Sequence, residues 1–281
     1  MERVEAPMGA ESELLRQETD DSQSEAPLLA DQRLQIAFFV QDGERDVCWK
    51  IRVREPFSYM ADLIEPIWAT HNPKGVCEVD ESAIERADVI VVQRHFPRPE
   101  HSGVLDRMLR SGKPVYYETD DLCHQGARRD TMPFGIGLET RAHVLDFIGK
   151  ASGLIVSTEA LKEAYLPYNK NISVLPTVHP AALIPTQAPP LRDQEPVTIG
   201  YVGTVTHLAD LRMIEPALLR IHKKYGKRVR FVFVGCVTPK LERLADRVER
   251  FSSLEEYLAK LPELGLDIGL APLQENDFNR G

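Results

Sequence analysis

The chain has 281 residues, 43% of them hydrophobic and 27% charged, which suits two soluble globular domains rather than one. No apolar run approaches the roughly 20 residues that span a bilayer, and nothing near the start resembles a signal peptide, so we expect a cytoplasmic protein without a transmembrane segment. The four cysteines lack the spacing of zinc sites, which favours reduced thiols and no metal site.

The net charge of −9 lies mainly in residues 1–33. This segment holds nine acidic and three basic residues, and it contains no aromatic side chain. Such a segment buries too little apolar surface to fold, so residues 1–33 are predicted to be a disordered acidic leader. The remaining body is nearly neutral, and without clustered positive charge we expect no nucleic-acid partner.

Short apolar runs follow the leader, each without the polar alternation of a half-buried strand. Such runs are typical of strands buried on both faces of a parallel sheet. They are Leu34–Val40, Asp88–Val92, Pro114–Tyr117, Gly153–Val156 and Ile172–Leu175. Between them, helical spacing of apolar residues predicts helices at Phe57–Trp68, Val104–Leu109, Leu138–Ile148 and Glu159–Tyr165. This alternation predicts an α/β, doubly wound, Rossmann-like domain over residues 34–176.

Six prolines fall in the stretch that runs from Pro176 through Pro196. Proline fixes φ and removes a hydrogen-bond donor, so residues 177–196 are predicted to be an extended linker. Beyond it we expect strands at Val197–Val202, Val229–Val234 and Leu266–Leu270, and helices at Leu208–Tyr225 and Ser253–Leu261. The sequence therefore predicts a second Rossmann-like domain over residues 197–281, facing the first across a cleft. It is expected to be incomplete, because doubly wound domains usually have roughly five or six strands.

The first candidate site follows the predicted strand at Val197–Val202. The segment from Gly200 to His207 joins that strand to a long helix and carries Gly203, Thr204 and Thr206. Free N–H groups and the helix dipole at such a turn favour a phosphate. The glycine spacing matches neither the dinucleotide-binding fingerprint nor a P-loop, and a plain helix-capping turn is the alternative.

The second candidate site lies at strand ends of the first domain, where ligands of open α/β sheets bind. Glu118, Asp120 and Asp121 directly follow one strand, and adjacent carboxylates can act as a base or orient sugar hydroxyls. His95 follows another strand, and Arg52 follows the first one, where it could meet an anionic acceptor or a phosphate. The alternatives are a helix cap, a structural histidine and a solvated arginine.

Several segments after the linker agree in order and spacing with one enzyme family. They are Ile199–Thr204, Thr206-His207, Asp210-Leu211, Ile214, Pro216–Leu218, Phe231–Gly235, Asp267–Leu273, Asn276, Phe278 and Asn279. The stretch from Ile199 to Gly281 resembles the donor-binding domain of group 1 glycosyltransferases of the family 4 type, whose fold is called GT-B. The first domain resembles these enzymes more loosely, at Arg52, Gln93-Arg94, Glu118 and Asp120-Asp121 among other positions.

The resemblance implies that the second domain holds a nucleotide-diphosphate sugar and the first domain a glycan or lipid-linked acceptor. The implied contacts are Gly203, Thr204, Thr206 and His207 for the diphosphate, Arg250 and Phe251 for the base, and Asn276, Phe278 and Asn279 for the sugar. In the first domain, Arg52 and Glu118 would bind the acceptor, and His95, Asp120 and Asp121 would be catalytic. The resemblance also implies that transfer retains anomeric configuration and needs no cofactor or metal. It places the enzyme in glycan or cell-surface polysaccharide synthesis, which is compatible with peripheral contact with a membrane.

Two features depart from the family's pattern. Thr204 and, approximately, Asp210 stand where many relatives carry an arginine and a lysine aimed at the diphosphate. Relatives also continue past the point that corresponds to Gly281, with a helix whose two glutamates hold the ribose and the sugar. A non-catalytic fragment or binding module, and less so a sugar-nucleotide epimerase, are therefore the alternatives to a transferase.

Overall fold

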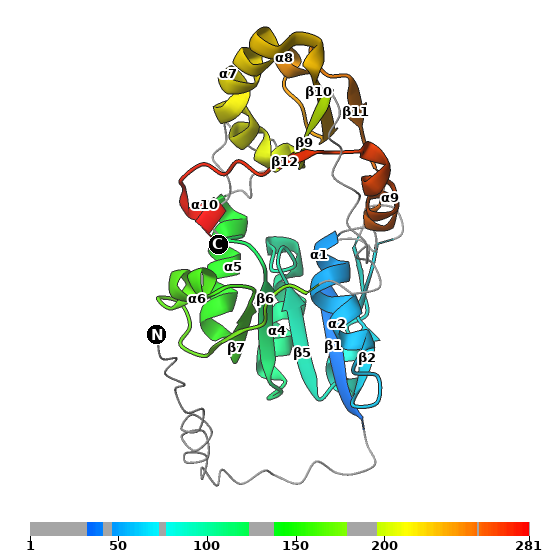
Figure 1. Cartoon of the computed structure of the whole chain (residues 1–281). Helices are drawn as coiled ribbons and strands as arrows, with labels where there is room; N and C mark the ends of the chain where they lie inside the picture. Colours follow the sequence, from blue (N-terminus) through cyan, green and yellow to red (C-terminus); the bar gives the residue numbers. More distant parts are fainter. Residues whose placement is uncertain are drawn as a thin grey trace, which may run out of the picture. The chain divides into compact units, whose positions relative to one another are not determined.

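The computed structural model describes residues 33–41, 47–72, 77–123, 138–178, 196–251 and 253–280. These residues form two parallel β-sheets, each with its own helices (Figure 1). The predicted leader lies outside the described residues except for Arg33, and most of the predicted linker lies outside them too. The expected boundaries of both segments, and the expected cleft between the domains, stay predictions.

The first sheet has six strands in the order β2-β1-β5-β6-β7-β8, and every neighbouring pair is parallel. The strands are β1 (Leu34–Val40), β2 (Ile64–Trp68), β5 (Val89–Gln93), β6 (Val115–Thr119), β7 (Gly153–Val156) and β8 (Ile172–Val174). A separate antiparallel pair, β3 (Thr70–His71) and β4 (Glu78–Val79), follows β2. Because β1 lies between β2 and β5, the strand order reverses at β1.

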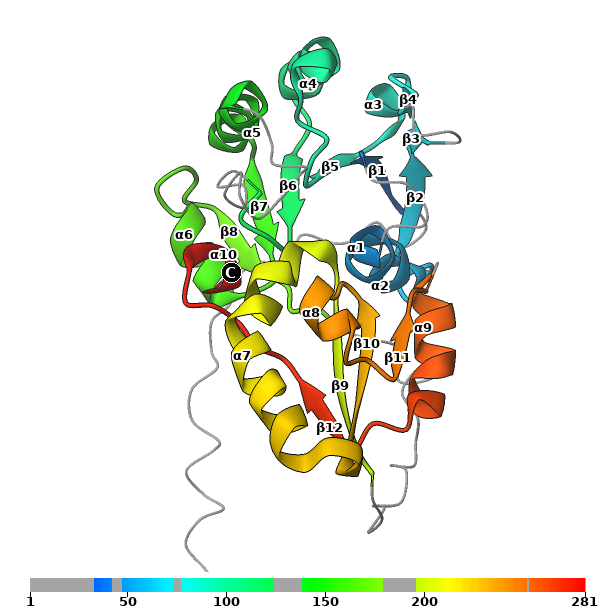
Figure 2. The same ribbon diagram turned by 90° about the horizontal axis from the view of Figure 1, so that it is seen from above.

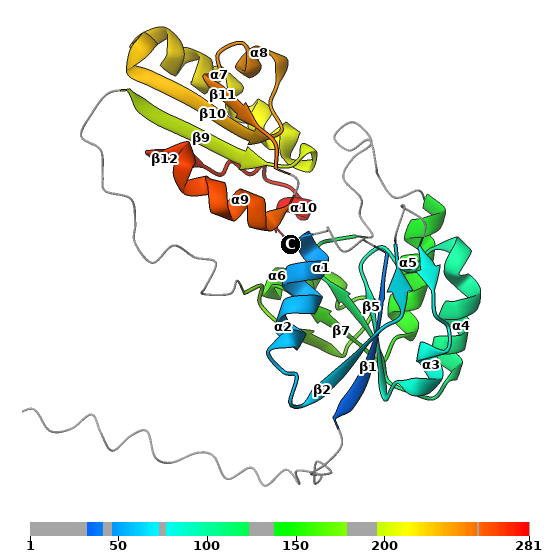
Figure 3. The same cartoon turned by 90° about the vertical axis from the view of Figure 1, so that its right-hand side faces the viewer.

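Helices cover both faces of the first sheet, because β1 alternates its side chains between two apolar clusters. Ala37 and Phe39 pack with α4 (Ser102–Arg110), α5 (Leu138–Lys150) and α6 (Glu159–Tyr165). Ile36, Phe38 and Val40 pack on the opposite face with Val53 and with side chains near it. Figure 3 shows α4 and α5 on one side of this sheet and α1 and α2 on the other.

One continuous stretch of helix covers that second face. It consists of α1 (Val47–Trp49), the π-helix η1 (Lys50–Arg54) and α2 (Glu55–Ser58). A π-turn inside a helix is rare and is frequent at functional sites. Among the described residues of this domain, the other short helices are α3 (Ala83–Arg86) and the 3₁₀ turn η2 (Pro99–His101).

The predicted helix at Phe57–Trp68 is wrong. The helix ends at Ser58, a turn follows, and Ile64–Trp68 is strand β2, paired with β1. Two of the residues that suggested an apolar helix face are exposed, with Tyr59 at 75% and Leu63 at 63%. Pro66 explains the outcome, because proline breaks a helix interior but is tolerated on an edge strand such as β2.

The second sheet has four parallel strands in the order β11-β10-β9-β12. They are β9 (Val197–Gly203), β10 (Val229–Gly235), β11 (Arg247–Glu249) and β12 (Ile268–Leu270). Figure 2 shows α7 (Leu208–Tyr225) and α9 (Leu254–Lys260) on opposite faces of this sheet. The short elements are η4 (Val205–His207), η5 (Gly226–Arg228), α8 (Pro239–Glu242), η6 (Leu261–Leu264) and α10 (Asp277–Arg280).

The predicted bounds of helix α7 are confirmed, and α9 lies within the range predicted for it, Ser253–Leu261. Gly226 ends α7 with a φ of +55°, a conformation that glycine adopts without a steric cost. The Ser253 hydroxyl caps α9 by accepting a hydrogen bond from the Glu256 N–H at 3.1 Å. Strand β11 was missed, because its three residues, Arg-Val-Glu, carry no apolar run.

The same aspartate contact fixes the start of three strands. Asp88, Asp246 and Asp267 each stand directly before a strand, and each carboxylate accepts a backbone N–H from the neighbouring strand at 2.7 to 2.9 Å. The three N–H donors are Gln35, Thr198 and Phe231. These carboxylates satisfy backbone donors at the amino ends of strands, away from the edge where ligands bind in this type of sheet.

Candidate functional site

Both sheets have a position where the strand order reverses, which is where open parallel sheets bind ligands at the carboxyl ends of their strands. In the first sheet this position lies between β1 and β5, and in the second between β9 and β12. The candidate residues lie at or just beyond the carboxyl ends of strands at these edges: Gln93 to His95 at the end of β5, Glu118 to Asp121 at the end of β6, and Gly203 to His207 at the end of β9.

The turn after β9 is held by a close approach of two backbones. Gly235, at the end of β10, has a φ of +86°, and a Cβ atom there would lie 2.2 Å from the Gly203 carbonyl oxygen. The same carbonyl accepts the N–H of Cys236 at 2.8 Å. Only glycine fits at position 235, and its contact fixes where β9 ends and the turn begins.

The turn leads through Thr204 and η4 into α7, which has 18 residues. The hydroxyl oxygens of Thr204 and Thr206 are 2.6 Å apart. His207 is the N-cap residue of α7, and its side chain makes no capping hydrogen bond to the helix backbone. The positive end of a long helix and two hydroxyl groups therefore lie together at the carboxyl end of β9, an arrangement that suits an anion.

A buried carboxylate ties this turn to the segment after β12. Asp210, in the first turn of α7, is 3% exposed. Its Oδ1 accepts the Gln274 backbone N–H and the Asn279 amide, both at 2.9 Å, and its Oδ2 lies 2.9 Å from Nδ1 of His207. Burial alone would raise the pKa of Asp210, but these hydrogen bonds outweigh burial and lower it. The carboxylate is thus ionised at neutral pH and matched by its donors.

The other predicted donor-binding residues follow the same edge of the second sheet. Asn276 caps α10, since its Oδ1 accepts the Asn279 N–H at 2.8 Å. Arg250 and Phe251 follow β11, and the Phe251 ring contacts Tyr257 at a centroid distance of 5.9 Å. Phe278 lies in α10, but its side chain is outside the described residues.

In the first sheet, Arg94 joins two of the predicted catalytic carboxylates. Its Nη1 lies 3.1 Å from Asp120 Oδ1 and its Nη2 lies 2.7 Å from Asp121 Oδ2. Among the described residues other than glycine, it alone has a positive φ, +42°. Burial raises the pKa of Asp121 even though Arg94 opposes that effect. Strained backbone of this kind is concentrated at functional sites, where the surrounding structure holds it in place.

Behind Arg94 lies a second, deeper ion pair. Arg52 is 2% exposed and Glu118 3% exposed, and Arg52 Nε donates to Glu118 Oε1 at 2.8 Å. Gln93 donates to the other carboxylate oxygen at 2.9 Å, and Arg52 Nη1 donates to the Leu175 carbonyl at 2.7 Å. Burial raises the pKa of Glu118 to about 7, although Arg52 opposes that effect. The role of the pair in binding an acceptor stays a prediction. The buried pair lies behind Arg94 and can hold the residues of this edge in place.

The sequence placed these groups at strand ends but not in contact with one another. His95 is half-buried beside Arg94, as its position after β5 implies. Arg94 and Gln93 were missed as site residues, although Gln93 ends the same strand, Arg94 follows it, and both contact the carboxylates. The roles predicted for His95, Asp120 and Asp121 are untested by this geometry.

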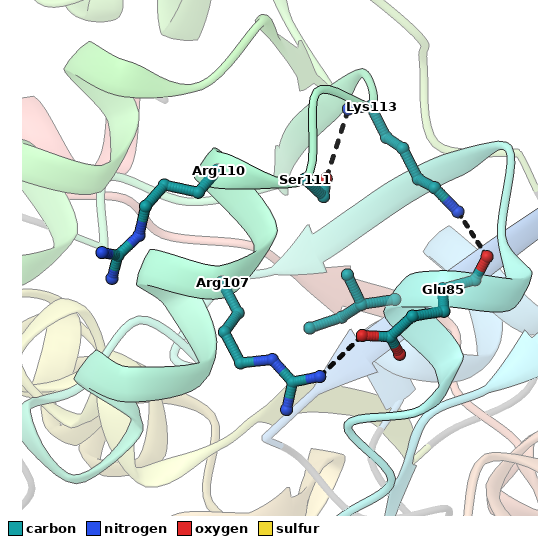
Figure 4. Close-up of a pocket in the computed structure, with 6 residues that line it drawn as sticks. Glu85, Arg107, Arg110, Ser111 and Lys113 are labelled. Atoms are coloured by element: carbon teal, nitrogen blue, oxygen red, sulfur yellow. Dashed lines mark hydrogen bonds and ion pairs between the residues drawn. The ribbon is translucent and has the colours of Figure 1, made fainter.

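A cavity of about 380 Å³ lies elsewhere, beside α3 and the C-terminal end of α4 (Figure 4). Its lining is Ile84, Glu85, Arg107, Arg110, Ser111 and Lys113. Its charges are mostly paired, with Arg107 Nη2 2.6 Å from Glu85 Oε1 and Lys113 Nζ 2.6 Å from the Glu85 carbonyl. It is at the amino ends of β5 and β6, opposite the candidate site.

Comparisons with known proteins decide the fold. No protein-family model matches the chain, and no curated protein does. The chain is similar to the solved structure of a sucrose-phosphate synthase from Thermosynechococcus elongatus, with 16% identity, 86% of this chain and 77% of the other covered, and a TM-score of 0.53. It is also similar to an α-glucosyltransferase in complex with UDP-glucose and DNA containing an abasic site, with 9% identity, 86% and 74% covered, and a TM-score of 0.52.

The chain has the GT-B glycosyltransferase-like fold. The GT-B fold expected from the segments after Ile199 is thereby confirmed across both sheets. At these identities the likeness shows the fold alone, so donor, acceptor and stereochemistry stay predictions.

Three further observations bear on what this GT-B chain could bind. None of its four cysteines forms a disulfide bond. Within the described ranges, no three His, Cys, Asp or Glu side chains gather as a metal site. None of the described helices is both long and apolar enough to cross a membrane. The expectations of no cofactor and no nucleic-acid partner stay predictions.

Proposed function

We propose that this chain is a glycosyltransferase that moves a sugar from a nucleoside-diphosphate sugar to a glycan or lipid-linked acceptor. The donor binds at the carboxyl edge of the second sheet, between β9 and β12. The acceptor binds at the carboxyl edge of the first sheet, near Arg94 and its two carboxylates. The two similar structures named above are a sucrose-phosphate synthase and an α-glucosyltransferase, and they support this assignment only through the shared fold.

One observation carries the proposal most strongly. The segments after β9 and β12 are the two that border the reversal of strand order, and Asp210 joins them through His207 on one side and Gln274 and Asn279 on the other. They surround the positive end of α7. A diphosphate there meets backbone N–H groups and the hydroxyls of Thr204 and Thr206, while the negative charge of Asp210 is already matched.

The chemistry follows from where charge develops. As the bond from the sugar to the diphosphate breaks, negative charge grows on the departing phosphate oxygen, and donors already fixed around it lower the barrier. In the first domain, Asp120 and Asp121 orient an acceptor hydroxyl, and His95 accepts the proton that this hydroxyl loses as it bonds to the sugar. We propose that transfer retains anomeric configuration and requires no metal, as in the family that the sequence resembles.

The test is a screen of the full chain with UDP-, GDP- and dTDP-sugars, read by mass spectrometry with and without glycan and lipid acceptors. The proposal expects binding of at least one sugar nucleotide and transfer that His207→Ala weakens. An Asp246→Asn variant, altered at the amino end of β11, serves as the control and keeps wild-type transfer. Binding without transfer would indicate a binding module, and a new sugar nucleotide formed from donor alone would indicate an epimerase. Binding of none of them would refute the proposal.

A further inference from the structure

The Asp210 carboxylate accepts more hydrogen bonds than are needed to stabilise the first turn of helix α7. A carboxylate in the first turn of a helix is favourable for its dipole alone. Here the side chain is buried and accepts from three donors, which come from three places: the residue before α7, the loop after β12 and helix α10. Two of them lie 64 and 69 residues away in the sequence.

The first consequence concerns the Asn279 side chain. Its amide nitrogen donates to Asp210 Oδ1 and to the Gln274 carbonyl, both at 2.9 Å. A primary amide has two N–H groups, and both are used. The atom of this side chain that can meet a ligand is therefore its carbonyl oxygen, which accepts from a hydroxyl group and repels a phosphate oxygen.

The second consequence concerns the His207 ring. An ionised carboxylate only accepts hydrogen bonds, so Nδ1 of His207 carries the proton that faces Asp210 Oδ2. This fixes the ring orientation and makes Nε2 the nitrogen that can meet a ligand. Proteins commonly fix a functional imidazole in this way: one ring nitrogen bonds to a carboxylate, and the other nitrogen faces the ligand.

We propose that Asp210 is a positioning residue of the donor site and that Asn279 contributes to its specificity. Asp210 turns the Asn279 carbonyl oxygen toward a hydroxyl of the transferred sugar, and it holds His207 so that Nε2, protonated when the donor is bound, donates to a diphosphate oxygen. The inference rests on the proposed function, and what it adds is the role of Asp210, which sets the orientation of two side chains already expected at the donor. Asp210 therefore acts on the donor through its neighbours.

The experiment compares ligands that differ by the sugar alone. Affinities of the full chain for UDP and UDP-glucose, and for GDP and dTDP with their glucose conjugates, are measured by calorimetry. Asn279→Ala is expected to weaken the sugar nucleotide about tenfold and leave the nucleoside diphosphate within twofold, because one hydrogen bond to the sugar is lost. His207→Gln is expected to weaken both ligands equally.

Asp210→Asn keeps the size of the side chain but turns an N–H group toward one of its three donors. It is expected to lower the affinity for both ligands. Added to the His207→Gln, Asn279→Ala double variant, it is expected to lower these affinities by less than a further factor of two, since Asp210 acts through those two residues. Asp246→Asn makes the same chemical change at the amino end of β11 and is expected to leave both affinities unchanged. A loss from Asp210→Asn that adds in full to the double variant, or no loss at all, would overturn the inference.

A readout that does not depend on variant folding is the tautomer of His207. In ¹⁵N-histidine-labelled wild type, assigned with His207→Gln, the proton is expected on Nδ1, and the Nε2 resonance should shift when UDP is added. A proton on Nε2 alone, or an unchanged Nε2 resonance at saturating UDP, would overturn the inference. If the wild type binds none of the nucleotides, the proposed function fails first, and that result differs from every variant outcome above.

Discussion

Replacing Glu118 by glutamine should remove a pH dependence from the stability of the first domain. Glu118 is buried against Arg52, and its pKa is raised from 4.5 to about 7, chiefly by burial. Below pH 4.5 the side chain is protonated in both the folded and the unfolded chain. Above pH 7 it is ionised in both. Between these values the folded chain binds the proton more tightly, so the free energy of unfolding falls as the pH rises.

The magnitude follows from those two values. At about 1.4 kcal/mol per pH unit, the difference between 4.5 and about 7 makes the contribution about 3 kcal/mol. Glutamine does not titrate and still accepts the Arg52 Nε–H. Its amide nitrogen then faces Gln93, whose Oε1 is buried without a partner among the described residues and can accept from it after the Gln93 amide turns over.

The assay is urea unfolding at pH 5 and pH 8, followed by tryptophan fluorescence. Both tryptophans, Trp49 and Trp68, lie in the first domain, so the signal reports on that domain. The stability of the wild type minus that of Glu118→Gln is expected to fall by about 2–3 kcal/mol between the two pH values. Glu163→Gln makes the same change at an exposed position on α6 and is expected to show no such fall.

Subtracting the stability of the variant from that of the wild type removes the effect of all other titrating groups, because these groups are common to both proteins. A wild-type minus Glu118→Gln difference that stays constant within about 0.5 kcal/mol would show that Glu118 ionises normally in the folded chain. A difference that grows with pH would show that Arg52 outweighs burial. Either result would refute the reasoning from burial.

Three further outcomes are expected. Arg94→Ala should raise the pKa of Asp121 further, so transfer should weaken at least about tenfold at low pH while calorimetric donor affinity stays within twofold; equal losses in both would contradict this. Gly235→Ala should cost about 2–4 kcal/mol of unfolding free energy by circular dichroism, whereas Gly103→Ala, in an open position on α4, should stabilise the chain by up to about 1 kcal/mol. Thr158→Ala should cost about 1 kcal/mol, because the Thr158 hydroxyl caps α6, and no loss would show that water replaces the cap.

Most strands of both sheets could be predicted from the sequence, because continuous apolar runs of four to seven residues have few alternatives to a buried parallel strand. The failure at Phe57–Trp68 shows the limit. Helical spacing of apolar residues was present there, but Tyr59 and Leu63 are exposed, and Pro66 belongs to an edge strand. Strand β11 lay below detection, since three partly polar residues at a sheet edge have no pattern.

The candidate sites divide in the same way. Glu118, Asp120 and Asp121 could be chosen because residues at the end of a buried strand, or directly after it, lie at the carboxyl edge. Their pairing with Arg52 and Arg94 depends on how η1 and the turn after β5 are placed, which local sequence does not specify. The contacts of Asp210 join positions more than sixty residues apart, and no spacing rule reaches that far.

Hydrogen exchange measured by mass spectrometry, with and without the sugar nucleotide that binds, tests the central claim most directly. The claim is that the donor lies where the strand order of the second sheet reverses. Protection is expected at residues 203–211 and 271–280, the segments after β9 and β12 that Asp210 joins. Binding that leaves both segments unprotected, or that protects the cavity around Arg107 and Lys113 instead, would contradict the account.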